Sequence, residues 1–201
     1  MAARALVLAS GSAARLRLLR DAGFDPVVEI SGVDEDGVDA EDTGSLVRAL
    51  AERKADAVSP RAGDAVVVGC DSLFEFDGRV HGKPASVAEA RTWLHSMRRR
   101  EGVLFTGHCV IDGATGARAV GVATTVVRFA DTTDEEIEAY LATGEAMAAA
   151  GAFTLDGRSA PFVGGVEGDP SNVIGLSLPL LRELLAGLGI AVTELWQEAG
   201  A

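Results

Sequence analysis

The sequence contains no apolar run that approaches the ~18–20 consecutive residues of a membrane-spanning helix. Residues 1–10 carry too short an apolar stretch for the core of a signal peptide, and a glycine-serine turn follows directly. Cysteine is also scarce, because the chain has only Cys70 and Cys109, without the spacing of a metal site. We therefore expect no membrane partner, a cytoplasmic location, and two buried thiols in a reducing compartment.

Positive charge is in short supply. The 18 lysines and arginines stand against 30 aspartates and glutamates, which gives a formal net charge of −12 and a pI near 4.6. Such a chain repels a polymer of phosphates, so no nucleic-acid partner is expected. A small phosphorylated ligand is compatible with this charge where basic side chains gather locally and a divalent cation screens the phosphates.

The composition is that of a globular domain, with 48% hydrophobic and 24% charged residues. We find no internal repeat and no linker, so residues 1–201 are expected to form a single domain, with room for two lobes. Strand and helix patterns alternate over the first seventy residues, which predicts an α/β sheet with parallel pairs. In this part the predicted elements are strands at 5–9, 26–30 and 65–70 and helices at 12–22 and 43–58. Farther along they are a hairpin at 73–80, a helix at 86–98, strands at 103–112 and 117–129, a helix at 133–142, strands at 152–155 and 161–166, and a helix at 179–187.

The first candidate site is a turn of small residues, 9–15, between the first strand and the first helix. A helix N-terminus presents free backbone N–H groups and a partial positive charge, which favour an anion. The hydroxyls of Ser10 and Ser12 and the guanidinium of Arg15 add donors for phosphate oxygens. The same residues also suit an ordinary tight turn with a serine cap, and the P-loop motif is not present.

Two acidic residues are candidates for metal binding or proton transfer. Asp71 follows the apolar run that ends at Cys70, and ligands of α/β sheets gather at the carboxyl ends of strands. An acid there can hold a metal or take a proton from water, and it can equally cap the next turn. Glu35 lies in an acidic stretch at 34–42 and is either a metal ligand or part of a solvated loop.

Two lysines are candidates for binding phosphate. Lys54 lies within an apolar stripe of helix 43–58, so its ammonium either extends past the edge of the stripe or points at an anion. Lys83 lies in a loop restricted by Pro84 and is either a phosphate ligand or a surface lysine. Together with the serine-arginine turn, these lysines could stabilise a phosphoryl transition state by electrostatics.

Several motifs occur in a fixed order along nearly the whole chain. They are LASGSAARLRLL at 8–19, VDE at 33–35, LAERKA at 50–55, VVVGCDS at 66–72, DGRVHGKP at 77–84, FTGHCVI at 105–111, YLATGE at 140–145, GAFTLDG at 151–157 and EGDPSNVIGLSLPLL at 167–181. In this combination the sequence resembles the Maf family, the septum-formation-inhibitor-type nucleoside triphosphate pyrophosphatases. The Cys70-Asp71-Ser72 triplet resembles an actinobacterial-type branch of that family.

The resemblance implies a mixed α/β fold with an elongated central sheet flanked by helices and a cleft between two lobes, like the inosine-triphosphate pyrophosphatases. It implies metal-dependent hydrolysis, with Mg²⁺ or Mn²⁺, of nucleoside 5′-triphosphates (ribo or deoxy) between the α and β phosphates. Asp71 matches the family's proposed proton acceptor, and Glu35 matches a polar position of its cleft. Our hypothesis is that Asp71 and Glu35 hold the metal ion. The positions that match the family's substrate-binding residues are Ser10, Ser12, Arg15, Lys54 and Lys83. A homodimer is also implied.

Three positions depart from the pyrimidine-preferring branch of the family. Ala13 and Ala14 stand where that branch has a proline and an arginine, and Asp156 stands where it has a glutamine. An aspartate offers no amide donor, so hydrogen bonds to the base must differ. The resemblance therefore leaves the preferred base unassigned.

Two other functions fit the same residues. A nucleotidyltransferase also uses a strand, a small-residue loop and an arginine, and it needs an acceptor molecule. A nucleotide-sensing regulator of cell division would bind a nucleotide without turnover. Analysis of the products separates these functions, because hydrolysis needs water alone and releases free monophosphate.

Overall fold

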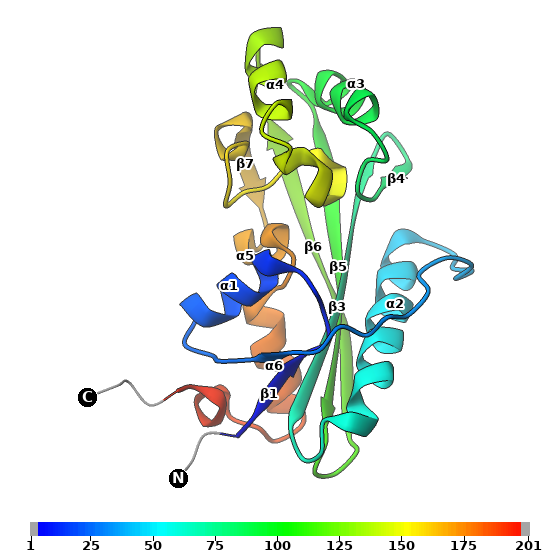
Figure 1. Cartoon of the computed structure of the whole chain (residues 1–201), viewed down its shortest axis with the longest axis vertical. Helices are drawn as coiled ribbons and strands as arrows, with labels where there is room; N and C mark the ends of the chain where they lie inside the picture. Colours follow the sequence, from blue (N-terminus) through cyan, green and yellow to red (C-terminus); the bar gives the residue numbers. More distant parts are fainter. Residues whose placement is uncertain (1–3, 198–201) are drawn as a thin grey trace. The chain divides into compact units, whose positions relative to one another are not determined.

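The computed structural model describes residues 4–197, and these contain a seven-stranded mixed sheet flanked by helices (Figure 1). The strands are β1 (Leu6–Leu8), β2 (Val27–Val28), β3 (Val66–Phe76), β4 (Arg79–His81), β5 (Glu101–Asp112), β6 (Arg118–Phe129) and β7 (Val163–Glu167). Their order in the sheet is β2-β1-β3-β5-β6-β7, and β4 pairs with β3 off this path. β1 is parallel to β2 and β3, whereas β4 and β7 run antiparallel to β3 and β6. The predicted mixed α/β sheet with early parallel pairs is therefore confirmed.

The chain divides into two compact units. The first unit comprises the residues up to 71, residues 106–123 and those from 175 onward, and the second unit comprises residues 72–105 and 124–174. Each unit has its own apolar clusters. A single Maf-like domain over 1–201 and a cleft between two lobes stay predictions.

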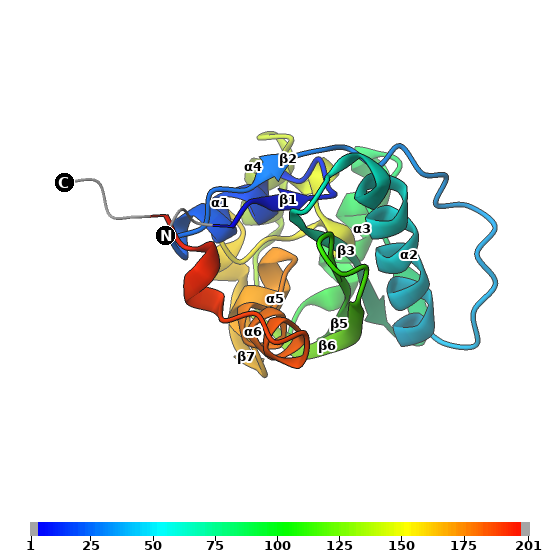
Figure 2. The ribbon, with the colours of Figure 1, turned by 90° about the horizontal axis from the view of Figure 1, so that it is seen from below.

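In the first unit, alternate residues of β3 face opposite layers of helices. Val66, Val68 and Cys70 belong to a cluster with residues of α1 (Ala13–Asp21) and α6 (Leu178–Gly187). Val67 instead packs with residues of α2 (Thr43–Val58), which lies on the other side of β3 (Figure 2). Because successive side chains of a strand point to opposite faces, a strand covered on both faces is apolar throughout. This explains the continuous apolar run before Asp71.

Two glycines let α2 lie directly against the sheet. A Cβ atom on Gly69 would overlap the backbone of Ala51 and Ala55, and one on Gly107 would overlap the backbone of Val47. Only glycine allows so close an approach of two backbones. As a result, the helix that carries Lys54 is held close to β3.

The helix starts of the first unit follow local signals. The side chain of Ser12 accepts a hydrogen bond from the backbone N–H of Arg15 and caps α1, as predicted. Asp42 caps α2, and this helix spans residues 43–58 as the sequence predicts. Ser177 caps α6, which begins one residue before its predicted start.

The second unit packs around aromatic rings and contains α3 (Val87–Met97), α4 (Asp134–Leu141) and α5 (Pro170–Ile174). The rings of Phe74, Phe129 and Phe153 meet edge to face, with centroids between 5.0 and 5.8 Å apart. A capping box of Thr133 and Glu136 begins α4, as the spacing predicts. α5 is too short to carry an amphipathic pattern and was not predicted.

The predicted division of residues 65–76 is wrong. The sequence suggests one strand that ends at residue 70 and a second that begins at 73, whereas β3 continues without a break through Asp71. Asp71 is therefore part of a strand, with its side chain 10% exposed, and does not cap a turn. The predicted hairpin at 73–80 is confirmed, because Phe76 pairs with Arg79.

The predicted strand at 152–155 is also wrong. Ala150–Ala152 form a 3₁₀ turn, in which Gly151 and Ala152 have φ angles of 70° and 64°. Left-handed backbone of this kind cannot continue a strand. Residues 152–155 suggested a strand because they are mostly apolar. Ala152 and Phe153 are indeed buried, but a packed turn buries apolar residues equally well.

Over residues 4–197 no helix is long and apolar enough to cross a membrane. Cys70 and Cys109 are both buried and free, which confirms the prediction of buried thiols.

Candidate active site

Arg15, in the first turn of α1, is buried and holds three oxygens. Its Nε donates to the carbonyl of Gly175 at 2.6 Å, and its Nη1 donates to Ser10 Oγ at 3.0 Å and to the Cys70 carbonyl at 3.1 Å. A buried cation is tolerated when such partners replace its water. Arg15 is only 8% exposed, so these contacts fix the guanidinium beside the strand residue that precedes Asp71.

The two serines of the turn organise its backbone. Ser12 Oγ accepts from Arg15 N at 3.4 Å, and Ser10 Oγ accepts from Ser12 N at 3.3 Å. Both hydroxyls therefore act as acceptors here, and each keeps an O–H group that can donate to an anion. The two predictions for this turn, a serine cap and an anion site, are compatible.

Lys54 lies between two carboxylates. Its Nζ is 2.5 Å from Asp71 Oδ1 and 2.7 Å from Glu35 Oε1. Lys54 and Asp71 are 8% and 7% exposed, whereas the side chain of Glu35 is 56% exposed. Lys54 therefore points at anions and does not extend past the edge of the apolar stripe. The acidic loop contributes a charged partner through Glu35.

Burial raises the pKa of Asp71 above its usual value. The charges of Lys54 and Arg15 oppose this effect, and the charge of Glu35 adds to it. A carboxylate with a raised pKa is a stronger proton acceptor. Asp71 therefore has the electrostatic environment that a general base needs.

The neighbouring thiol has no such environment. Burial raises the pKa of Cys70 to about 11, so it carries a proton at neutral pH and is a poor nucleophile. What Cys70 contributes to the site is its backbone carbonyl, which binds Arg15.

Glu35 and Asp71 are the residues that could hold a metal ion. Within residues 4–197, no group of three or more His, Cys, Asp or Glu is arranged to hold one. Mg²⁺ usually takes one or two carboxylates and completes its shell with water and substrate phosphates. The oxygens of Glu35 and Asp71 converge on one cation, the ammonium of Lys54, and this oxygen donor set fits Mg²⁺ or Mn²⁺.

Lys83 belongs to the second unit and has no part in the contacts described above. It is exposed and lies between β4 and α3, where the carbonyl of Gly82 accepts from Gly151 N at 3.0 Å. Asp156 is also an exposed residue of the second unit. The first unit thus brings together six of the predicted site residues, and the role of Lys83 stays a prediction.

Two contributors to this site were not predicted. The Gly175 carbonyl binds Arg15 from 160 positions along the chain, and a backbone oxygen leaves no mark in a sequence. His108 is fully buried, and its Nε2 accepts from the N–H of Ser177, near Gly175. The signal available in the sequence was a histidine inside an apolar strand.

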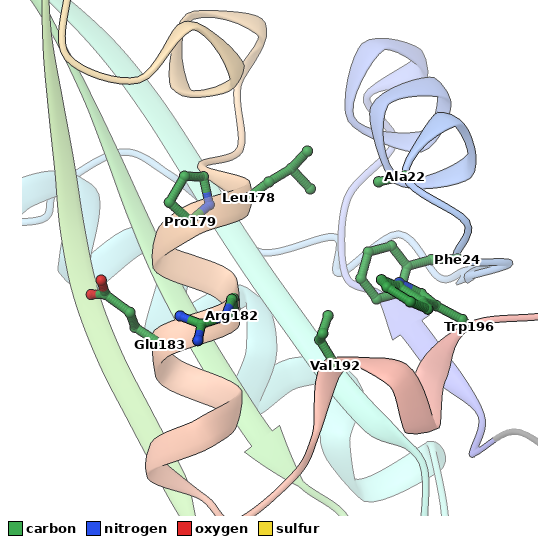
Figure 3. A pocket seen from close by; sticks show the side chains of 8 residues that line it. All are labelled: Ala22, Phe24, Leu178, Pro179, Arg182, Glu183, Val192 and Trp196. Carbon is green, nitrogen blue, oxygen red and sulfur yellow. The ribbon is translucent and has the colours of Figure 1, made fainter.

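A separate surface pocket of about 390 Å³ lies elsewhere in the first unit (Figure 3). Figure 3 shows Phe24 and Trp196 on one side and the start of α6 on the other. Its lining consists of Ala22, Phe24, Leu178, Pro179, Arg182, Glu183, Val192 and Trp196. These residues include none of the candidate site residues, and mostly apolar walls do not suit a triphosphate.

Comparisons with known proteins identify the family of this chain. Residues 5–188 match the family model described as Maf-like protein. A nucleoside triphosphate pyrophosphatase from Streptomyces coelicolor is 57% identical over 98% of this chain and 96% of its own length. One from Streptomyces avermitilis is 54% identical over 96% of this chain and 95% of its own.

Among solved structures, the chain is similar to a nucleoside-triphosphatase / dITP/XTP pyrophosphatase from Mycobacterium abscessus. The TM-score is 0.38 and the sequences are 18% identical, over 63% of this chain and 75% of that one. A similarity this low does not support any assignment of function.

Proposed function

Because the chain belongs to the Maf-like protein family, we propose that it hydrolyses nucleoside 5′-triphosphates, ribo or deoxy, between the α and β phosphates. The products are the nucleoside monophosphate and pyrophosphate. The expectation of an enzyme is confirmed at the level of class, since the curated relatives are named nucleoside triphosphate pyrophosphatases.

The observation that supports this proposal is that Lys54 forms ion pairs with both Asp71 and Glu35. Arg15 is held next to them by hydrogen bonds to Ser10 and to the carbonyl of Cys70. Asp71, with its raised pKa, takes a proton from the attacking water. The oxygen of that water forms a bond to the α phosphorus as the bond to pyrophosphate breaks. Lys54 and Arg15 stabilise the negative charge on the phosphates in the transition state.

The proposed cofactor is one Mg²⁺ or Mn²⁺ ion held by Asp71 and Glu35. When bound, it supplies Lewis-acid polarisation of a phosphate oxygen. A carboxylate that is both metal ligand and proton acceptor has to divide its two oxygens between these tasks. Glu35, whose side chain is mostly exposed, is the ligand that can move with the substrate.

The test is a product analysis. The purified protein is incubated with single ribo- and deoxynucleoside triphosphates, normal and modified, and with Mg²⁺ or Mn²⁺ in ¹⁸O-labelled water. We expect equal amounts of monophosphate and pyrophosphate, with the label in the monophosphate, and no products in excess chelator. Inorganic phosphate with a nucleoside diphosphate, or label in pyrophosphate, would contradict attack at the α phosphorus.

The same assay distinguishes the two alternatives. A nucleotidyltransferase would release pyrophosphate only when an acceptor such as a sugar phosphate is added. A non-catalytic regulator would bind triphosphate and release nothing. A cytoplasmic location and a homodimer stay predictions, which fractionation of cells and light scattering of the purified protein would test.

A further inference from the structure

His108 is a fully buried imidazole that the proposed chemistry does not use. It lies on β5 in the first unit, and both of its ring nitrogens meet backbone groups. Nε2 is 2.8 Å from the backbone nitrogen of Ser177, and Nδ1 is 3.0 Å from the carbonyl oxygen of Thr106. A buried ring with two such contacts is held in one orientation.

The two partners determine where the proton of His108 lies. A backbone N–H can only donate, so Nε2 accepts from Ser177 and carries no hydrogen. A carbonyl can only accept, so Nδ1 carries the hydrogen and donates it to Thr106. The ring is therefore neutral in this arrangement, with its acceptor directed at the segment that precedes α6.

The segment from Gly175 to Ser177 is fixed at both ends. Ser177 caps α6 and is bound by His108, and Gly175 accepts from Arg15 Nε at 2.6 Å. Between them, Leu176 is fully buried in the core of the first unit. The position of the oxygen that holds Arg15 is thus determined partly by His108.

We propose that His108 is a positioning residue, which holds Arg15 in place through the segment from Gly175 to Ser177. This proposal rests on the proposed function, because Arg15 is there a ligand of the triphosphate. The imidazole acts on Arg15 through two hydrogen bonds, one at each end of this three-residue segment. Loss of the Nε2 acceptor leaves a buried N–H of Ser177 without its partner, and the segment then moves.

The test compares three variants at His108 and at a matched position. His108→Leu removes the acceptor, His108→Gln places an amide oxygen near the position of Nε2, and Val110→Ala opens a cavity two residues along the same buried face. We expect KM for the triphosphate to rise about ten-fold in His108→Leu, with a smaller change in kcat. We expect His108→Gln to restore most of the loss and Val110→Ala to leave KM unchanged.

A double-mutant cycle shows whether the effect passes through Arg15. On an Arg15→Lys background, His108→Leu should raise KM no further, because the lysine lacks the Nε–H that binds Gly175. An unchanged KM in His108→Leu, or the same further rise on the Arg15→Lys background, overturns the proposal.

A measurement without turnover separates this proposal from the proposed function. The hydrogen on Arg15 Nε can be followed by NMR, and its resonance is assigned by its loss in Arg15→Lys. This hydrogen should exchange with solvent faster in His108→Leu than in Val110→Ala. Equal exchange in these two variants overturns the positioning role. If wild-type protein released no pyrophosphate while exchange still differed, the proposed function alone would fail.

Discussion

Two ion pairs of this chain have similar contacts and opposite surroundings. Lys54 meets Asp71 in the first unit, where their side chains are 9% and 10% exposed. Arg91 meets both oxygens of Glu138 in the second unit, where the side chains are 41% and 50% exposed. Water solvates the second pair before and after it forms, whereas the first pair has given up most of its hydration.

The two pairs differ in burial, and this difference indicates which of them is suited to catalysis. Burial of a charged pair gains little net stability, because the attraction is offset by the lost hydration. Burial also raises the pKa of the Asp71 carboxyl, and the charge of Lys54 only partly opposes this shift. For Glu138 the hydrogen bond to Arg91 lowers the pKa. The buried pair is therefore the one suited to proton transfer.

Asp71→Asn should produce the largest effect. The amide keeps the shape of the side chain and cannot accept the proton of water, so turnover should fall by about 10²–10⁴-fold. Pyrophosphate release measures the change, and circular dichroism checks the fold. Glu138→Gln, the matched change in the exposed pair, should keep wild-type turnover. Near wild-type turnover in a folded Asp71→Asn variant would remove Asp71 from the chemistry.

Lys54→Met tests how the buried ion pair contributes to the stability of the fold. It leaves the carboxylate of Asp71 buried without its nearest cation, so the free energy of unfolding at pH 8 should fall by about 3 kcal/mol. Since the charge of Lys54 lowers the pKa of Asp71, the variant raises that pKa further, and protonation at low pH should reduce the deficit. Urea unfolding at pH 8 and pH 5 measures both effects. A deficit that is the same at the two pH values would contradict an uncompensated buried carboxylate.

The pH dependence of stability tests the direction of the Asp71 shift. Because the folded-state pKa of Asp71 is raised, the folded state binds its proton more tightly than the unfolded state. The stability contributed by this proton is present below the unfolded pKa and is lost as the pH rises through the folded pKa. Asp71→Asn should therefore gain stability relative to wild type as the pH rises from about 4. A difference that declines with pH would mean that the pKa is lowered.

Arg91→Ala should give the smallest effect. Both partners are exposed, and water replaces the lost contacts. We expect unchanged turnover and a small loss of thermal stability that disappears in concentrated salt. A stability loss as large as that of Lys54→Met would show that burial is not what separates the two pairs.

Local signals explain which parts of the fold were predictable. α2 spans residues 43–58 in both prediction and structure, because its apolar spacing and the proline at 60 act within a few residues. The capping box that begins α4 is equally local. By contrast, residues 152–155 were predicted as a strand, whereas Ala152 lies in a 3₁₀ turn, since apolar residue types do not reveal a positive φ.

The candidate site was predictable as a set of residue types and not as a set of contacts. Glu35 and Lys54 were each open to a solvated alternative, and only their contacts with each other and with Asp71 decide between the readings. The resemblance to the Maf family indicated which residues belong to the site. It could not indicate the contact of Arg15 with the Gly175 carbonyl, because every residue type has a backbone carbonyl.

By itself, the sequence determined, to within one residue, where α1, α2, α3, α4 and α6 begin, and which ionisable groups the chain contains. These follow from spacing, caps and chain-wide charge, which are properties of neighbours along the chain. Tertiary structure alone decided the upward shift of the Asp71 pKa and the neutral form of His108. The physical reason is that hydration and hydrogen-bond direction depend on atoms that folding brings together from distant positions.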